Sequence, residues 1–148
     1  MGRIVGIDPG EARIGIAISD EEARIAFPHS AVSARGGIAE AVQRVCDALA
    51  DQEISSVVVG LPLRLDGGEG EAARRARVFG AALAEAMQMD VVYWDERLTT
   101  VAAERSLREM GKRGSKRRAV VDQSAAAILL QGYLDAKKGG TWSDLDDH

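Results

Sequence analysis

The sequence predicts an α/β fold in which helices cover both faces of a mixed sheet. Two observations carry this prediction. Short apolar runs rich in Val and Ile recur along the chain, and segments with helical spacing of apolar residues separate the later runs. The early runs follow one another with only turns between them, which is typical of antiparallel strands. Alternation of strands and helices later in the chain favours parallel pairing.

The N-terminal part of the chain predicts three consecutive strands. Residues 3–8 and 14–19 are apolar runs on either side of the turn "DPGEAR", and together they predict a hairpin. A third strand is expected over 24–33. Pro28 assigns that strand to an edge of the sheet, because proline has no backbone N–H to donate to a neighbour.

The remaining elements alternate between helix and strand. The runs "SSVVVGLP" and "DVVYW" are β-branched and bounded by turn residues, so they predict buried strands. Thr99 or Thr100 is suited to cap a helix. The expected elements are helices over 37–52, 72–88, 101–110 and 118–136, strands over 55–62 and 90–94, and a loop over 64–71.

Composition places the chain among ordinary globular domains. Its 148 residues, 46% hydrophobic and 28% charged, predict one domain over 1–137 and a disordered acidic tail over 138–148. No apolar run reaches the length of a membrane span and no signal peptide is expected, so no membrane partner is predicted. The single cysteine, Cys46, excludes an internal disulfide and favours a reducing, cytoplasmic location.

Three carboxylates are candidates for a metal site. Asp8 ends the first strand, Glu96 follows the strand over 90–94, and Asp122 lies early in the last helix. In such sheets, ligands bind beyond the carboxyl ends of the parallel strands. With one cysteine and two histidines in the chain, a metal would be held by carboxylates, which favours Mg²⁺ or Mn²⁺. Two such ions about 4 Å apart could activate a water and stabilise the leaving oxygen in phosphodiester cleavage.

Each acid also has a simpler interpretation. Asp8 could be a turn residue, Glu96 could pair with Arg97 on the surface, and Asp122 could favour the helix dipole. Asp95 is expected to be a local cap or turn residue rather than a ligand. The spacing alone leaves these alternatives open.

Basic residues predict contacts with a nucleic-acid backbone, although the net charge is −4. The run "KRGSKRR" (112–118) is interpreted as a mobile loop that contacts phosphates, with a solvated loop as the alternative. Few residues are aromatic, 4%, so backbone recognition is favoured over base stacking. The candidates for nucleic-acid binding are Arg13, Arg64, Arg74, Arg75, Lys112, Arg113, Lys116, Arg117 and Arg118, and the supporting residues are Gly10, Arg97 and Thr99. Gly10 could let the backbone approach the site or could simply serve the turn. Arg97 is expected to neutralise the acids.

Three motifs give the chain a resemblance to a known family. They are "GIDPGEARIGIAISD", "VVGLPLRLDGGEGEAARRARVFGAAL", and "DERLTTVAAERSL" with "VDQSAAAILLQGYLD". Together they resemble the YqgF family of Holliday junction resolvases and pre-16S rRNA nucleases, within the ribonuclease H-like superfamily, over nearly all of residues 3–135. Arg64 departs from the family, which usually has Asn there, and Asp66 lies in a glycine loop outside the acidic set.

The resemblance implies a ribonuclease H-like fold, with a five-stranded mixed sheet flanked by helices. It also implies that Asp8, Glu96 and Asp122 form the family's metal-binding acidic triad, for two Mg²⁺ or Mn²⁺ ions. The implied activity is that of a metal-dependent endonuclease acting on structured nucleic acid. It would either process the 5′ end of pre-16S rRNA or resolve Holliday junctions.

Two other functions remain open at this point. A nucleic-acid-binding protein could retain the fold without catalysis. An actin-like nucleotide-binding domain also opens with a strand, an Asp and a glycine turn, but that fold needs two lobes and the chain supplies one. The sequence does not decide between an rRNA precursor and branched DNA as partner, or between a monomer and a homodimer; a dimer would suit a resolvase, which cuts two opposed strands.

Overall fold

The computed structural model describes residues 2–98 and 115–138, and in the last helix it describes side chains from residue 124 onward. In chain order the elements are β1 (Arg3–Pro9), β2 (Arg13–Ser19), β3 (Ala26–Ser33), α1 (Ile38–Ala48), β4 (Ile54–Leu61), α2 (Glu71–Met87), β5 (Val91–Asp95), the 3₁₀ turn η1 (Glu96–Leu98) and α4 (Ser115–Lys138). The predicted succession of three strands followed by alternating helices and strands is confirmed.

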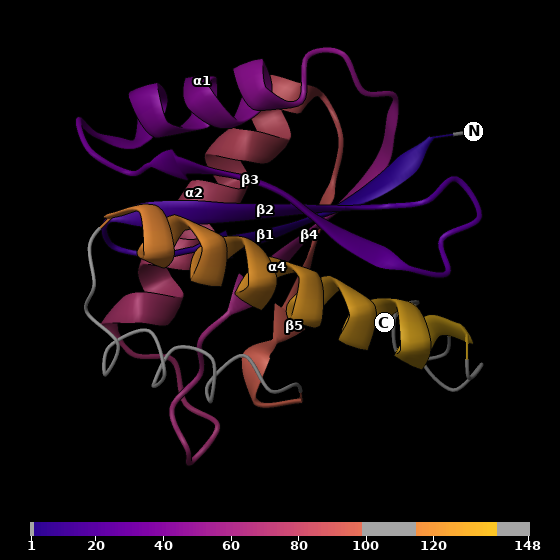
Figure 1. The fold of residues 1–148 in the computed structure, drawn as a ribbon. Helices are drawn as coiled ribbons and strands as arrows, with labels where there is room; N and C mark the ends of the chain where they lie inside the picture. Colours follow the sequence, from indigo (N-terminus) through magenta and orange to yellow (C-terminus); the bar gives the residue numbers. More distant parts are fainter. Residues whose placement is uncertain (1, 99–114, 139–148) are drawn as a thin grey trace.

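The strands form one five-stranded sheet in the order β3-β2-β1-β4-β5 (Figure 1). β2 pairs antiparallel with both β1 and β3, whereas β4 pairs parallel with both β1 and β5, so the sheet is mixed as predicted. Pro28 lies on β3, which is an edge strand, and the register between β2 and β3 shifts beside it, between Ile16 and Ala17.

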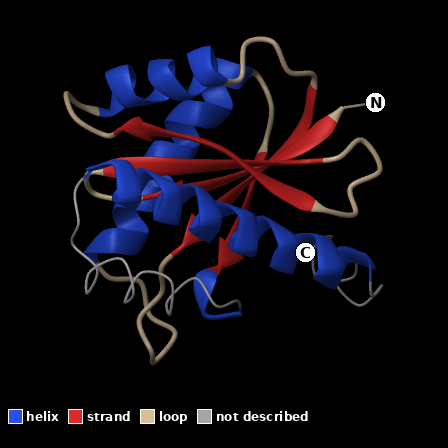
Figure 2. Cartoon of the chain, in the orientation of Figure 1, coloured by secondary structure: helices blue, strands red, loops and turns tan. Residues whose placement is uncertain are grey.

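Helices cover both faces of the sheet (Figure 2). α1 and α2 pack on one face against Val and Ile side chains of the central strands, and of the described helices α4 packs on the other. Because side chains alternate along a strand, successive residues of β1 serve different cores: Val5 and Ile7 face α1 and α2, while Ile4 faces α4. No helix among the described residues is both long and apolar enough to cross a membrane.

α4 crosses the sheet antiparallel to β1 and very close to it. A Cβ on Gly6 would lie 2.8 Å from Cβ of Leu130, so glycine is needed there for the helix to approach. Further along α4, the Gln131 side chain accepts a hydrogen bond from the backbone N–H of Ala26, 2.9 Å away, near the amino end of β1. The first turns of α4 therefore lie toward the carboxyl end of β1, as Figure 1 shows.

Apart from α4, two element boundaries differ from the sequence prediction by two residues or more, and the others by one at most. β3 begins at Ala26 rather than residue 24, because Asp20 Oδ1 accepts hydrogen bonds from the backbone N–H groups of Arg24 and Ile25, at 2.8 and 3.1 Å, and holds them in the preceding turn. α1 ends at Ala48 rather than 52, since tight backbone bonds such as Gln52 N–H to Leu49 O, 3.0 Å, close the chain into a turn.

The interpretation of residues 112–118 as a loop is wrong for its second half. α4 begins at Ser115, so Lys116, Arg117 and Arg118 occupy its first turn. Lys and Arg are good helix formers and Ser commonly starts a helix, which explains why a charged run continues the helix here. Lys112, Arg113, Thr99, the helix expected over 101–110 and the tail after residue 138 lie outside the described residues.

Candidate active site

Asp8 is a buried carboxylate at the carboxyl end of β1. Only 1% of its surface is exposed, so it is not the surface turn residue that its position after an apolar run also allowed. Asp8 follows Ile4 and Gly6 at alternate positions, both of which contact α4 or its core, so it lies on the α4 face of the sheet. This is the end at which ligands bind in sheets with parallel strands.

Glu96 lies on the same face, two strands away from Asp8. It starts η1 directly after β5 and is 4% exposed, which excludes a surface pair with Arg97. A Cβ on Gly60 would lie 2.8 Å from Glu96 Oε2, so the carboxylate occupies the space above this glycine. Ile7 pairs with Val59, and the next residues, Asp8 and Gly60, are therefore neighbours. The two buried acids thus flank Gly60.

Gly60 is a site residue that the sequence prediction missed. The run "SSVVVGLP" predicted a strand over 55–62 but gave Gly60 no role, and in the structure Gly60 lies inside β4 and pairs with Trp94 of β5. Any side chain there would collide with Leu129 and Glu96. A glycine within a β-branched run is a signal of close approach by another group, and that signal was present in the sequence.

Asp122 lies in the backbone of α4, one helical turn before Ala126. Ala126 contacts Gly6, because a Cβ on that glycine would lie 3.3 Å from the Ala126 carbonyl oxygen. Since α4 runs antiparallel to β1, position 122 lies further toward the end of the sheet that carries Asp8. Its side chain is outside the described part of the structure.

The described part of the site suits a hard metal ion by its donor chemistry. Asp8 and Glu96 offer carboxylate oxygens, the ligands that Mg²⁺ and Mn²⁺ prefer. Two neighbouring carboxylates, both almost fully buried, are costly unless positive charge compensates them. Among the described side chains, no three acids, histidines or cysteines gather into a metal site, so a third ligand would have to come from elsewhere, such as position 122.

Asp95 and Arg97 form a local ion pair beside the two acids. The Arg97 guanidinium donates to Asp95 at 2.7 Å, and the Arg97 backbone N–H donates to Asp95 Oδ1 at 2.9 Å. The side-chain bond from Arg97 is the main cause that lowers the pKa of Asp95. Asp95 therefore ends β5 and its carboxylate holds the turn that follows, while Arg97 pairs with this acid and also donates to Leu65 O at 3.3 Å.

Arg13 and Gly10 lie in and beside the turn that follows Asp8. A Cβ on Gly10 would lie 2.5 Å from the Arg13 carbonyl oxygen, so the turn itself requires glycine. Arg13 alternates with Gly15 and Ala17 on β2, which places it on the α4 face, and Gly15 pairs with Asp8. Within the described residues Arg13 has no ion pair, unlike the other candidate arginines whose side chains are described.

The remaining described candidates for nucleic-acid binding are each paired with an acid. Arg64 lies 3.4 Å from Asp66 in the glycine loop, and both side chains are exposed. Arg74 lies 3.5 Å from Glu71 within α2. Arg75 joins α2 to the β1–β2 turn through Glu11, 3.0 Å away. A phosphate would have to compete with these acids, although surface pairs of this kind are weak.

Comparison with known proteins identifies the family. A family model described as "RuvX: Holliday junction resolvase" matches residues 2–136. The chain belongs to the RuvX family. This confirms the resemblance carried by the three sequence motifs, because RuvX is the YqgF family under another name.

Individual relatives support the assignment over the whole RuvX domain. A protein of Chloroflexus aggregans named "Putative pre-16S rRNA nuclease" is 44% identical over 135 residues, which cover 91% of this chain and 94% of that protein. A protein of Nocardioides sp. with the same name is 45% identical, covering 90% of this chain and 88% of its own. The names given to the family and to its members describe nucleases.

A solved structure shows the same fold as this RuvX chain. Thermus thermophilus RuvC in complex with a Holliday junction substrate superimposes with a TM-score of 0.60 and 17% identity, covering 95% of this chain and 98% of that chain. The ribonuclease H-like fold predicted by resemblance is thereby confirmed.

Proposed function

We propose that the chain is a metal-dependent endonuclease that hydrolyses phosphodiester bonds in structured nucleic acid. The observation that carries the proposal is the pair of buried carboxylates, Asp8 and Glu96, on either side of Gly60. Membership of the RuvX family and the nuclease names of the relatives support it. A binding protein without catalysis would have no need to bury two acids at this position, since their desolvation is costly.

In this proposal Asp8, Glu96 and Asp122 hold the metal. Bound Mg²⁺ or Mn²⁺ would supply activation of a water and stabilisation of the leaving oxygen. Gly60 keeps the space above β4 open, so the Glu96 carboxylate can point toward Asp8. Leu129 of α4, itself fully buried, fills the space above Gly60 from the side of the helix. The rigid backbone of β1 fixes the direction of Asp8.

Basic groups at the same end of the sheet would hold the nucleic-acid backbone. Arg13 is on the face of Asp8 and has no acid partner among the described residues. The first turn of α4 carries Lys116, Arg117 and Arg118 and no acid. Cations at a helix N-terminus add to its positive dipole instead of balancing it, which is unfavourable without an anionic partner. A bound phosphate would compensate the positive charge of both the basic side chains and the helix N-terminus.

Cleavage of two substrates by one preparation tests the proposal. We expect hydrolysis of an rRNA precursor fragment or of a four-way DNA junction with Mg²⁺ or Mn²⁺, and no hydrolysis in excess EDTA. Water attack on phosphorus should leave a 5′-phosphate and a 3′-hydroxyl, by resemblance to ribonuclease H-like nucleases. A 2′,3′-cyclic phosphate, a covalent adduct with the protein, or full activity in EDTA would overturn the mechanism.

The Asp8→Asn variant separates catalysis from binding. We expect it to bind either substrate but not to cleave, because the buried acid is removed while the basic residues remain. If wild type and variant bind equally and neither cleaves either substrate, the chain is a binding protein that retains the fold. The better substrate in the same assay decides between rRNA and branched DNA.

A further inference from the structure

The end of the sheet opposite to Asp8 and Glu96 carries an open pocket whose lining side chains are mainly apolar. It lies between the last turns of α1 and α2 and the first residue of β4, and its volume is about 310 Å³. Its lining is mainly sulfur-containing and aliphatic: Cys46, Leu49, Ile54, Met87 and Met89. Gly60 and Asp8 lie at the other ends of their strands, so this pocket is separate from the candidate active site.

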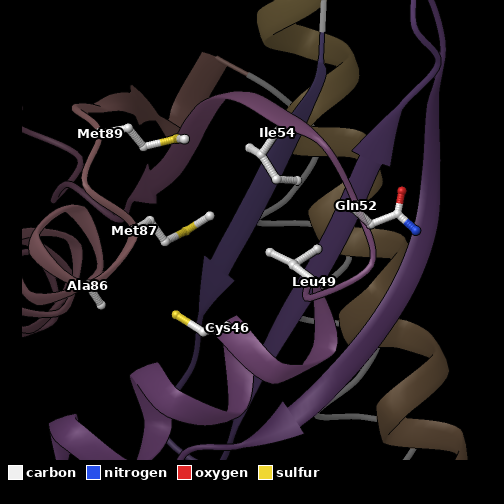
Figure 3. A pocket seen from close by; sticks show the side chains of 7 residues that line it. All are labelled: Cys46, Leu49, Gln52, Ile54, Ala86, Met87 and Met89. Atoms are coloured by element: carbon white, nitrogen blue, oxygen red, sulfur yellow. The ribbon is translucent and has the colours of Figure 1, made fainter.

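The lining side chains converge on a common space. Figure 3 shows Cys46, Leu49, Ile54 and Met87 pointing toward one another, while the amide of Gln52 points away. Burial, and then the nearby carboxylate of Asp47, raise the pKa of the Cys46 thiol, so the sulfur stays protonated and apolar at neutral pH. Methionine side chains adapt to differently shaped partners, which suits a docking surface.

The rim of the pocket is strongly acidic. The two chain segments that contain its lining residues, 46–54 and 86–89, contain no Lys, Arg or His. Exposed acids are neighbours in the chain of the lining residues, and throughout the described structure none of them forms an ion pair. These acids are Asp47, Asp51, Glu53, Glu85 and Asp90. Their uncompensated negative charge repels phosphates and attracts cationic groups.

We propose that the acid-rimmed pocket docks a basic protein segment, one of whose apolar side chains enters between Met87 and Met89 while its Lys or Arg side chains face the rim. Charge complementarity selects this occupant: nucleic acid and anionic lipid would be repelled, and a neutral apolar segment would leave the acids without partners. Proteins that bind nucleic acid are rich in Lys and Arg, so their basic segments have the chemistry of this partner. The inference does not depend on the proposed nuclease activity.

Methionine-methyl NMR of the full chain tests the proposal. Two of the four methionines line the pocket, so ¹³C-methyl signals of Met87 and Met89 report directly on its occupancy. The probes are a short synthetic peptide with a Leu-Phe pair flanked by lysines, its glutamine-for-lysine counterpart, and its serine-for-Leu-Phe counterpart. We expect saturable shifts of both signals with the first peptide only, weakening as salt is raised.

Matched charge reversals provide the control. Asp51→Lys with Asp90→Lys should weaken binding of the basic peptide about tenfold, the scale expected for reversing two exposed charges. The double variant Glu21→Lys with Glu22→Lys changes the net charge of the protein by the same amount, but on the β2–β3 turn. It should alter the affinity for the basic peptide by no more than about twofold. The Asp8→Asn variant should bind the peptide like wild type, so failure of the nuclease proposal would leave this result unaffected.

Four results would overturn the inference. They are the absence of shifts at Met87 and Met89, equal binding of the basic and glutamine peptides, and equal losses in the two double variants. The fourth is a change of these signals with protein concentration alone, which would make a second copy of the chain the occupant, through its own basic run at 112–118.

Discussion

The two faces of the sheet are built from the same strands but from different kinds of residue. The face under α1 and α2 consists of Val and Ile side chains such as Ile7, Ile16 and Val59, all fully buried. The face under α4 carries Gly6 and Gly60, where the helix approaches closely, together with the buried carboxylates. Both faces bury apolar side chains, at about 1.5–3 kcal/mol per large side chain, but among the described residues the buried carboxylates and their cost lie on the α4 face.

At the carboxyl ends of β1 and β4, this contrast places residues that serve stability and residues that serve chemistry next to one another, as in Ile7 and Asp8 or Val59 and Gly60. A substitution at one residue should affect unfolding, and a substitution at the next should affect cleavage. The following predictions are arranged by expected size, and each would either sharpen this separation or remove it.

The largest effect is expected for neutralising an acid of the α4 face. Glu96→Gln should reduce cleavage by about 10²–10³-fold or more, because a group that governs transition-state charge is removed. Its unfolding temperature should equal or exceed that of wild type without metal, since repulsion with Asp8 is relieved. Asp95→Asn is the matched control, with cleavage largely kept. Normal cleavage by Glu96→Gln would show that the acid triad is misassigned. Cleavage assays give the rate, and calorimetry gives the unfolding temperature.

Neighbouring residues of β4 should separate the two faces directly. In Gly60→Ala the new Cβ would collide with Leu129 Cδ1 and would lie 2.8 Å from Glu96 Oε2, so overpacking should cost about 1–3 kcal/mol and displace the carboxylate. Val59→Ala should cost about 2 kcal/mol because apolar burial decreases, but it should keep cleavage while folded. Denaturant unfolding and cleavage are measured for both. Equal loss of cleavage in the two variants would contradict the separation.

The basic first turn of α4 should contribute affinity without chemistry. Replacing Lys116, Arg117 and Arg118 by Ala should reduce the salt dependence of binding, with a change in slope of about 0.7–0.9 for each phosphate that is no longer neutralised. Turnover at saturating substrate should change little; adding Lys112→Ala and Arg113→Ala should extend the effect. Binding measured over a range of salt concentrations gives the slope. A slope unchanged from wild type would mean that these side chains meet only solvent.

The smallest effect is expected at the Asp95–Arg97 pair. The folded state lowers the pKa of Asp95, so the pair stabilises the fold above the unfolded value of about 3.9 and loses this contribution as pH falls through the lowered pKa. The stability difference between wild type and Asp95→Asn should therefore be constant near neutral pH and disappear in acid. Unfolding measured across pH tests this. If the stability difference between wild type and Asp95→Asn grew as the pH fell, the prediction would be wrong.

Much of the fold was predictable because the strands follow simple physical rules. Alternation and β-branched runs identified the strands, and Pro28 identified the edge. The start of α4 was not predicted, because the charge of residues 115–118 was weighed above their helix propensity. For these residues the charge pattern favours a loop and the helix propensity favours a helix, and contacts elsewhere in the fold decide between them.

The positions of Asp8 and Glu96 at one end of the sheet were predictable from the sequence, but their surroundings were not. Asp8 and Glu96 follow apolar runs, which indicated the end of the sheet on which they lie. The role of Gly60 depends on Leu129 and Glu96, which are distant in sequence, so only the folded structure reveals it. Likewise, Arg75 could be recognised as paired only once α2 and the β1–β2 turn were placed together.

The position of α4 along the chain has a consequence for biosynthesis. All five strands precede it, and the first of them already contains Asp8. During synthesis the sheet can pair and bury its Val and Ile face against α1 and α2 before α4 has left the ribosome. The face with the two acids stays uncovered until the last helix docks, for example through Gln131 and Ala26, which are 105 residues apart. A nascent chain should therefore reach a folded sheet earlier than it gains the capacity to cleave.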